Sequence, residues 1–287
     1  MSDNEYGIED LFDEPYARRQ FVQFMDIDDV ASVRNLDNIP VWKAFYREWS
    51  EEADEENIWW RHSISAEVYY AFKAFGKVTA KKIQQARSKG VGILPIPLSK
   101  ADYFNLAPGH PQKKVLYAAH PSDRLTYLPT AEFHRLAFEH KFAEAIRLLM
   151  HLGASTINVE HERGWDQEFA AKLSAGIPEA NANASVEASG GAHTRDRLLY
   201  EADLEGHSDP HIPDDLVWYP HEPTWQSAAE GRIDFGMEKF NLKLQYTEDY
   251  GVNADLAIDL QNIGIGLGGS FEKHQNTIWS LDGVFGG

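Results

Sequence analysis

Apolar residues in the middle of the chain follow the period of a helix and then the period of a strand. Between Thr130 and Gly153 they recur at intervals of four and three residues, at Phe138, Phe142, Ala145, Leu149 and Leu152. This spacing predicts a helix with one apolar stripe, which Thr130 caps and Gly153 ends. Residues Thr156–Glu162 then alternate, which predicts a strand with Ile157 and Val159 on one face.

A short apolar run at Val115–Ala119 precedes this helix and predicts a buried strand. Strand, helix and strand in this order resemble a crossover unit, in which the helix packs across a single sheet. The centre of the chain therefore predicts a helix-covered sheet.

Alternation of apolar and polar residues dominates the chain beyond this unit. It predicts strands at Ala180–Ser189, Arg197–Glu205 and Met237–Tyr246. We expect helices at Thr224–Gly231 and Ala254–Ile263, although the alternation from Val252 to Leu260 also permits a strand there. The tail after Gly268 places three apolar residues on one face: Trp279, Leu281 and Phe285.

The first third of the chain reads as mostly helical. Helices are expected near Tyr16–Met25, from Pro40 to Trp49, at Ile64–Phe75 and at Val78–Lys89, before a short strand within Gly90–Pro97. The sequence therefore predicts an α+β fold. A helical region at 1–97 precedes a mostly antiparallel sheet packed with helices at 98–287.

The amino-acid composition excludes several kinds of chemistry and of membrane protein. The chain has 287 residues, 43% of them hydrophobic, and no cysteine. Disulfides, thiolate catalysis and cysteine-ligated zinc are therefore excluded. No apolar run approaches the roughly 20 residues of a membrane-spanning helix, and the acidic N-terminus does not resemble a signal peptide. We therefore expect a cytoplasmic protein, whose net charge of −18 repels nucleic acid on average.

One segment of this acidic chain is basic. Lysines and arginines without any acid occupy the basic segment Lys73–Lys89, at Lys73, Lys77, Lys81, Lys82, Arg87 and Lys89. Such a segment can bind a protein partner or phosphate, or it can neutralise an acidic run of the same chain, such as Ser50–Asn57.

Within the basic segment, Ala74–Arg87 loosely resembles a helix-hairpin-helix motif. Gly76, Ala80 and Ile83 stand where that motif has its turn glycine, an alanine and an aliphatic residue, whereas Ala74 replaces the first turn glycine. The resemblance implies that the amides of the turn hold a phosphate. Nucleic-acid binding is therefore one alternative function.

A second candidate site is the loop that contains His207, Asp209 and His211. Two imidazoles and a carboxylate are good ligands for zinc or iron, and His221 and Glu222 follow on the same loop. This pattern suggests a metal-dependent hydrolase, with a divalent metal as the only candidate cofactor. His134, by contrast, lies on the apolar stripe of the central helix, which predicts a core histidine with one satisfied hydrogen bond.

The polar face of the predicted sheet carries many carboxylates: Glu160, Glu162, Glu201, Asp203 and Glu205. If these strands are neighbours, like charges lie opposite one another, which destabilises a sheet unless cations intervene. Lys239 and Lys243 can supply those cations, as can a bound cation or a basic partner.

No nucleophile elbow, phosphate-binding loop or dinucleotide fingerprint occurs in the sequence. The leading hypothesis is therefore a non-catalytic interaction or assembly protein that binds a protein partner through segregated acidic and basic surfaces. The alternatives are nucleic-acid binding, metal-dependent hydrolysis and membrane-active pore formation, the last suggested by the small, alternating residues of Ala180–Ser189.

Overall fold

The computed structural model describes residues 8–26, 81–165 and 198–286. The chain forms two compact units, the first containing residues 1–133 and 250–273 and the second containing 134–249 and 274–287. The boundary predicted between residues 97 and 98 falls inside the first unit. Helices and two mostly antiparallel sheets confirm the predicted α+β fold.

The sheet of the first unit has the strand order β2-β1-β3-β4. Its strands are β1 (Phe21–Met25), β2 (Ile93–Pro97), β3 (Leu116–Ala119) and β4 (Tyr127–Pro129). The β1 strand pairs parallel with β2 and antiparallel with β3. Its helices include α1 (Ile8–Asp13), α2 (Tyr16–Arg19), η1 (Leu98–Tyr103) and α9 (Ala254–Ile263), and residues 81–88 are helical as well.

Aromatic rings fill the core of the first unit. The Phe104 ring contacts the rings of Phe24 and Tyr127 edge to face, each with a centroid separation of 5.1 Å. Tyr117 contacts Phe24 in the same geometry at 5.4 Å. Such edge-to-face pairs are favourable beyond the area that they bury. Burial raises the pKa of Tyr127 to about 12.

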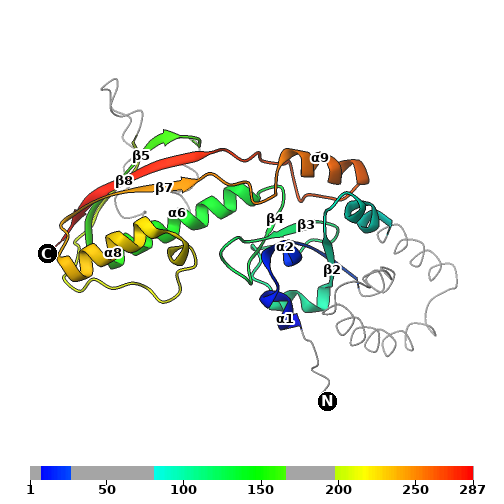
Figure 1. The fold of residues 1–287 in the computed structure, drawn as a ribbon, viewed down its shortest axis with the longest axis horizontal. Helices are drawn as coiled ribbons and strands as arrows, with labels where there is room; N and C mark the ends of the chain where they lie inside the picture. The colour runs from blue at the N-terminus through cyan, green and yellow to red at the C-terminus, as the bar shows by residue number, and fades with distance from the viewer. Residues whose placement is uncertain (1–7, 27–80, 166–197, 287) are drawn as a thin grey trace, which may run out of the picture. The chain divides into compact units, whose positions relative to one another are not determined.

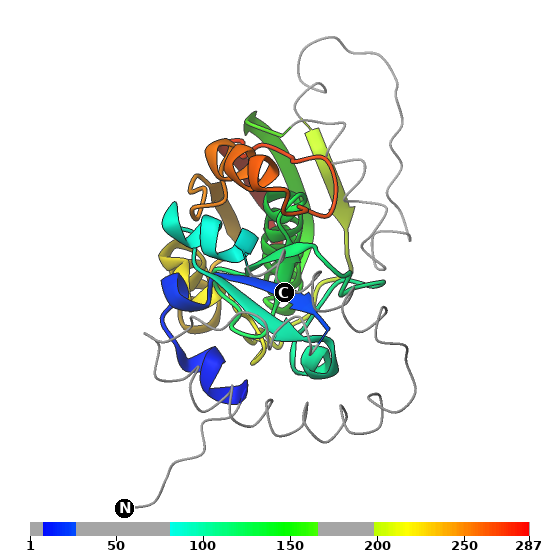
Figure 2. The same cartoon turned by 90° about the vertical axis from the view of Figure 1, so that its right-hand side faces the viewer.

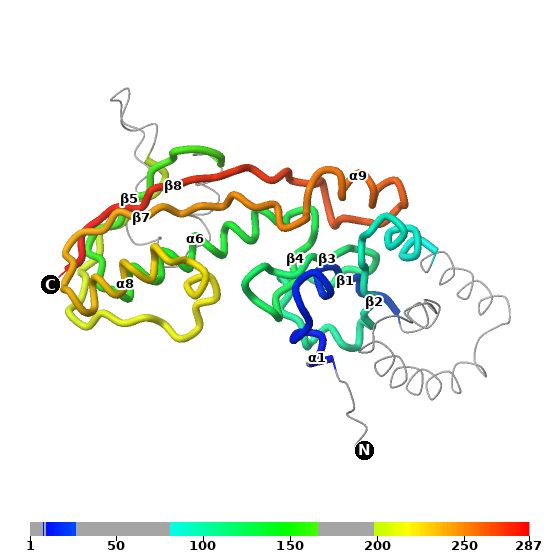
Figure 3. Tube along the Cα trace, in the orientation of Figure 1, coloured from blue at the N-terminus to red at the C-terminus, as the bar shows by residue number. Residues whose placement is uncertain are grey.

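The second unit contains a four-stranded sheet in which every neighbouring pair is antiparallel, in the order β6-β5-β8-β7. The strands are β5 (Ala154–Arg163), β6 (Leu198–Asp203), β7 (Lys239–Tyr246) and β8 (Thr277–Phe285). The helices are α6 (Phe133–His151), η4 (Tyr219–His221) and α8 (Pro223–Phe235). Both α6 and α8 lie on one side of this sheet (Figures 1 and 3).

The predicted apolar stripe of α6 packs against this sheet. Phe138 and Phe142 are buried, and their rings contact Trp279 of β8 edge to face at 4.8 and 5.3 Å. Leu149 is also fully buried. Figure 2 views α6 close to end-on, with a strand of the sheet running beside it. Gly153 ends the helix segment with a φ of +84°, as its position predicts.

Several sequence predictions hold for the later elements. Strand β6 lies within the predicted Arg197–Glu205 range, and β7 alternates between exposed and buried residues with its apolar face inward. The region Ala254–Ile263 is a helix rather than a strand, since Asn253 caps it and Gly264 ends it in a left-handed conformation. The predicted strand at 180–189 and the helices at 40–49 and 64–75 lie outside the described residues.

Three local predictions are wrong. The segment Tyr16–Met25 is not one helix, because its second half forms β1, whose residues are all buried between β2 and β3. The crossover unit does not form, since β3 and β5 belong to different sheets. Thr130 does not cap α6; its hydroxyl instead donates to the carbonyl oxygens of Leu116 or Leu267.

Within the described ranges, no helix has both the length and the apolar character that crossing a bilayer requires.

Candidate interaction site

The sheet of the second unit has an apolar inner face and a polar outer face. Along β7, the inner residues are Phe240, Leu242, Leu244 and Tyr246, all buried, and the outer residues are Lys239, Asn241, Lys243 and Gln245, all exposed. The two helices lie on the inner side (Figure 1). The outer face therefore presents a mainly polar surface built from four strands, with the exposed Val284 on β8.

The register of the strands decides how charges meet on this face. We predicted that β5 and β6 would place carboxylates opposite one another if they were neighbours. They are neighbours, but Glu201 faces Asn158 and Asp203 faces Thr156. The sheet thus avoids direct carboxylate pairs between β5 and β6 at these positions.

Lysine compensation, also expected from the sequence, occurs on the same face. The Nζ atom of Lys243 lies 2.9 Å from Glu162 Oε2 in an exposed ion pair. In the middle of the face, Asn158 donates a hydrogen bond of 3.3 Å to Asp282. Asp282 and Glu162 therefore have partners within the unit.

Among the described strands, β6 and β7 form the two edges of the sheet, and they carry opposite charges. Edge strand β6 exposes Glu201 and Asp203, and the exposed Glu205 follows it. Edge strand β7, on the other side, exposes Lys239 and Lys243, of which Lys243 forms the ion pair with Glu162, and the exposed Glu238 precedes it. The exposed charged side chains within β6 are thus acidic and those within β7 are basic.

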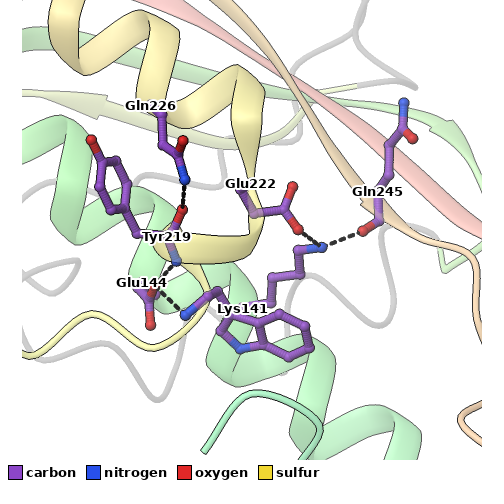
Figure 4. Close-up of polar contacts among 7 residues, drawn as sticks. Lys141, Glu144, Tyr219, Glu222, Gln226 and Gln245 are labelled. Atoms are coloured by element: carbon purple, nitrogen blue, oxygen red, sulfur yellow. Dashed lines mark hydrogen bonds and ion pairs between the residues drawn. The ribbon is translucent and has the colours of Figure 1, made fainter.

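Figure 4 shows a polar network that binds β7 to the helices of this unit. The Nζ atom of Lys141 on α6 donates to the carbonyl oxygen of Gln245 at 2.7 Å and forms an ion pair with Glu222. The same cation lies 4.9 Å from the centre of the Trp218 ring. Lys141 is almost fully buried, so these contacts replace the water that its charge has lost.

Glu144, one turn further along α6, binds the loop before η4. Its carboxylate accepts three backbone N–H groups, from Val217 at 2.9 Å and from Trp218 and Tyr219 at 2.8 Å each. Glu144 is itself buried, and hydrogen bonds to a buried charge are among the stronger ones in proteins. The loop is therefore fixed to α6 by one side chain.

Sequence reasoning missed both of these residues. The signal was present, because Lys141 is three residues from Phe138 and four from Ala145, and so shares their stripe. A charged residue on a buried stripe requires a partner, but the sequence does not show which distant segment provides it.

The metal hypothesis for His207, Asp209 and His211 gains no support from the structure. The four ring nitrogens of the two histidines all lie within hydrogen-bond distance of other groups: the Met150 carbonyl, the Asp209 amide and carbonyl, and His151. Among the residues that the structure describes, no three His, Cys, Asp or Glu side chains are grouped so that they could hold a metal ion.

The loop instead forms a histidine cluster with the end of α6. His151 Nδ1 lies 2.9 Å from His211 Nε2, and the two ring centroids are 4.8 Å apart. Burial, and then the charges of His211, Arg147 and His207, lower the pKa of His151. Arg147 itself forms a two-point ion pair with Asp215. In the contact between His151 and His211, one ring nitrogen must accept a hydrogen bond, so at least one of the two imidazoles is uncharged. This contact links the loop to the end of α6.

Three of the four described cations of the basic segment contact other groups of the first unit. Lys82 donates to the carbonyl oxygen of Gly264 at 2.7 Å, and Lys89 forms an ion pair with Asp259, so both contact α9 or its terminal glycine. Arg87 donates to the Ile93 carbonyl oxygen at 2.8 Å, and burial lowers its pKa. Lys81 is exposed. Lys73 and Lys77, like the turn of the helix-hairpin-helix resemblance, lie outside the described residues.

His134 is a core histidine, as predicted. It is fully buried, and its Nδ1 atom lies 3.1 Å from the Tyr246 hydroxyl.

No protein-family model matches the chain, and no curated protein or solved structure shows significant similarity to it. A functional proposal for this chain therefore has to rest on its own residues.

Proposed function

We propose that this chain is a non-catalytic interaction and assembly protein. Its contact surface is the outer face and the two edges of the second-unit sheet, and its partner is a protein. The observation that carries the proposal is the opposite charge of the two edges, with Glu201 and Asp203 exposed on β6 and Lys239 and Lys243 exposed on β7. Charges sorted in this way favour one orientation of a partner and oppose others.

The rigidity of β7 supports this use of the edge. Buried Lys141 binds the Gln245 carbonyl at one end of the strand, and Arg232 of α8 donates to the Met237 carbonyl at 3.1 Å just before the other end. The strand is therefore held at both ends before any partner arrives, which lowers the entropic cost of binding.

Nucleic-acid binding, the second hypothesis from the sequence, receives less support. Three of the cations on which it depends, Lys82, Arg87 and Lys89, contact carbonyl or carboxylate groups of the first unit. Cations engaged in this way are less available to neutralise phosphates.

Affinity capture from the native host with the full chain as bait tests the proposal. The charge-swapped variant Lys239→Glu/Lys243→Glu should lose the proteins that the natural chain retains, because both edges of its sheet would then be acidic. Cross-linking of the retained proteins followed by mass spectrometry should place them on β6, β7 or the outer face.

The matched control is Lys113→Glu/Arg124→Glu. It makes the same change in net charge on two exposed side chains of the first unit, each in a surface ion pair with an aspartate. Capture that is equally reduced in both variants would show that net charge, not the sheet, governs binding. Proteins retained equally by all three chains would exclude β7 as the contact.

A further inference from the structure

We infer that these edges bind a second copy of this chain, head to tail, so that β7 of one copy pairs antiparallel with β6 of the next. This inference rests on the proposed function and names the partner.

The direction of the strands permits this continuation. All three neighbouring pairs in the order β6-β5-β8-β7 are antiparallel, so the two edge strands run in opposite directions. A copy translated along the sheet therefore places its β6 antiparallel to β7 of the first copy. The apolar faces and their α6 helices then remain on one side of the extended sheet.

Backbone hydrogen bonding within the sheet leaves matching groups at both edges. Leu204 N–H donates to the Ser155 carbonyl and Phe285 N–H donates to the Glu238 carbonyl. In an antiparallel ladder the direction of these groups alternates along each strand. The N–H and C=O groups of 201 and 203 on β6, and of 239, 241 and 243 on β7, consequently point away from their own sheet.

The free part of the β7 edge has defined ends. By the same alternation, the carbonyl groups of Met237 and Gln245 also point outward, and both already accept hydrogen bonds, from Arg232 and Lys141. Lys239, Asn241 and Lys243 lie between them, in a segment of a length suited to a short strand. Lysines on an edge strand also oppose indiscriminate pairing with other strands.

Charge complementarity selects the head-to-tail arrangement. One row of residues crosses the sheet as Asp203, Thr156, Val284 and Lys239. If a second copy continues this row without a change of register, its Asp203 lies opposite Lys239 of the first copy. A shift of two residues places Glu201 opposite Lys243 and keeps each side chain on its face.

Pairing of like edges is disfavoured, because two β7 edges would bring lysines together and two β6 edges would bring carboxylates together. A self-complementary dimer through one edge is therefore not expected. Head-to-tail contacts form rings if successive copies close on themselves and open filaments if they do not.

Charge swaps in the full chain test the inference. Sedimentation of the natural chain over a range of concentrations should show species larger than a dimer. Lys239→Glu/Lys243→Glu and Glu201→Lys/Asp203→Lys should each weaken association by about 10-fold, because the direct attractive pair of either register, Asp203 with Lys239 or Glu201 with Lys243, becomes repulsive. An equimolar mixture of the two variants should recover assembly, because each edge then meets the opposite charge.

Cysteine cross-linking gives an independent readout, since the chain has no cysteine of its own. Under mild oxidation, Asp203→Cys/Lys239→Cys should give a ladder of covalent multimers if the register is unshifted. Asp203→Cys/Asn241→Cys should do so if it is shifted by two residues. Paired Cα atoms about 5.5 Å apart are within disulfide range. The single variants Asp203→Cys and Lys239→Cys should give no such ladder.

Two outcomes would overturn the inference. One is a chain that sediments as a monomer at every concentration. The other is a Lys239→Cys variant that forms cross-linked dimers as efficiently as the Asp203→Cys/Lys239→Cys pair. A monomeric chain whose host partners are nevertheless lost on the Lys239→Glu/Lys243→Glu swap would overturn self-assembly alone. The proposed interaction function would then stand.

Discussion

Lys141 donates a hydrogen bond of 2.7 Å to the carbonyl oxygen of Gln245. A buried charge on the core side of α6 is thereby bonded to the edge strand on which the proposed interface depends. Lys141 forms an ion pair with Glu222 as well, so α6, β7 and the start of α8 meet at one ammonium group (Figure 4).

Substitution of Lys141 tests the importance of this contact. Lys141→Ala should lower the free energy of unfolding by about 3 kcal/mol, because Glu222 loses its cation and the Gln245 carbonyl loses its donor. Lys141→Met should cost less, since it retains the packing of the stem. Urea denaturation measures both. The control Lys243→Ala removes only an exposed ion pair and should cost about 0.5 kcal/mol; equal losses in the Lys141→Ala and Lys243→Ala variants would refute this prediction.

Glu144 should be equally sensitive to an isosteric change. In Glu144→Gln the amide group can no longer accept from all three backbone N–H groups, and we expect a loss of about 2 kcal/mol in the free energy of unfolding. Glu139→Gln is the control on the same helix, where the carboxylate forms an ion pair with Arg135 one turn away. Its cost should be about 0.5 kcal/mol, and a Glu144→Gln chain as stable as this control would contradict the prediction.

The histidine cluster predicts a dependence of stability on pH. In the folded chain, the pKa of His151 lies below its ordinary value of 6.5. Near and below pH 6.5, the unfolded chain therefore binds more protons at this residue than the folded chain does. The stabilising contribution is therefore present above about pH 6.5 and is lost as the pH falls through the folded pKa. Burial lowers the pKa of His151 most, followed by the charges of His211, Arg147 and His207, whereas Asp215 opposes them.

Urea denaturation at about pH 7.5 and about pH 5.5 measures this effect. His151→Gln should reduce the loss of stability between the two pH values, and part of the loss should remain because burial also lowers the pKa of His274. A His151→Gln chain with the pH dependence of the natural chain would show that the cluster does not couple protons to folding.

Gly283 should tolerate no side chain. A Cβ atom at this position would overlap the Thr156 carbonyl oxygen and would lie 2.6 Å from the Phe240 ring. Gly283→Ala should therefore cost about 3 kcal/mol in the free energy of unfolding, because β5 and β8 would have to separate. Gly92→Ala, where no heavy atom lies within 4 Å, should change stability by less than about 0.5 kcal/mol; thermal denaturation of the two variants compares them directly.

Periodicity predicted the elements whose stability comes from one apolar stripe or face. The stripe of α6, the alternation of β7 and the face of Trp279 and Leu281 are all visible in the sequence and buried in the structure. Periodicity failed at Phe21–Met25, where burial on both sides hides the alternation of a strand.

The candidate site was predictable only in part. Carboxylates near β5 and β6 and lysines near β7 were recognised as a charged sheet surface, and the Lys243–Glu162 pair followed from that expectation. Their division between opposite edges could not be predicted, because the strand order β6-β5-β8-β7 differs from the order of the strands in the chain. The roles of Lys141 and Glu144 depend on segments about 70 to 100 residues away.

The sequence by itself determined the α+β class, the faces of the main helices and strands, and the exclusion of cysteine chemistry, because periodicity and composition are local properties of a chain. Tertiary structure alone decided which strands became edges, which charges were buried and which histidines met. Those outcomes depend on contacts between distant segments, whose register is set by packing and not by the residues next to them.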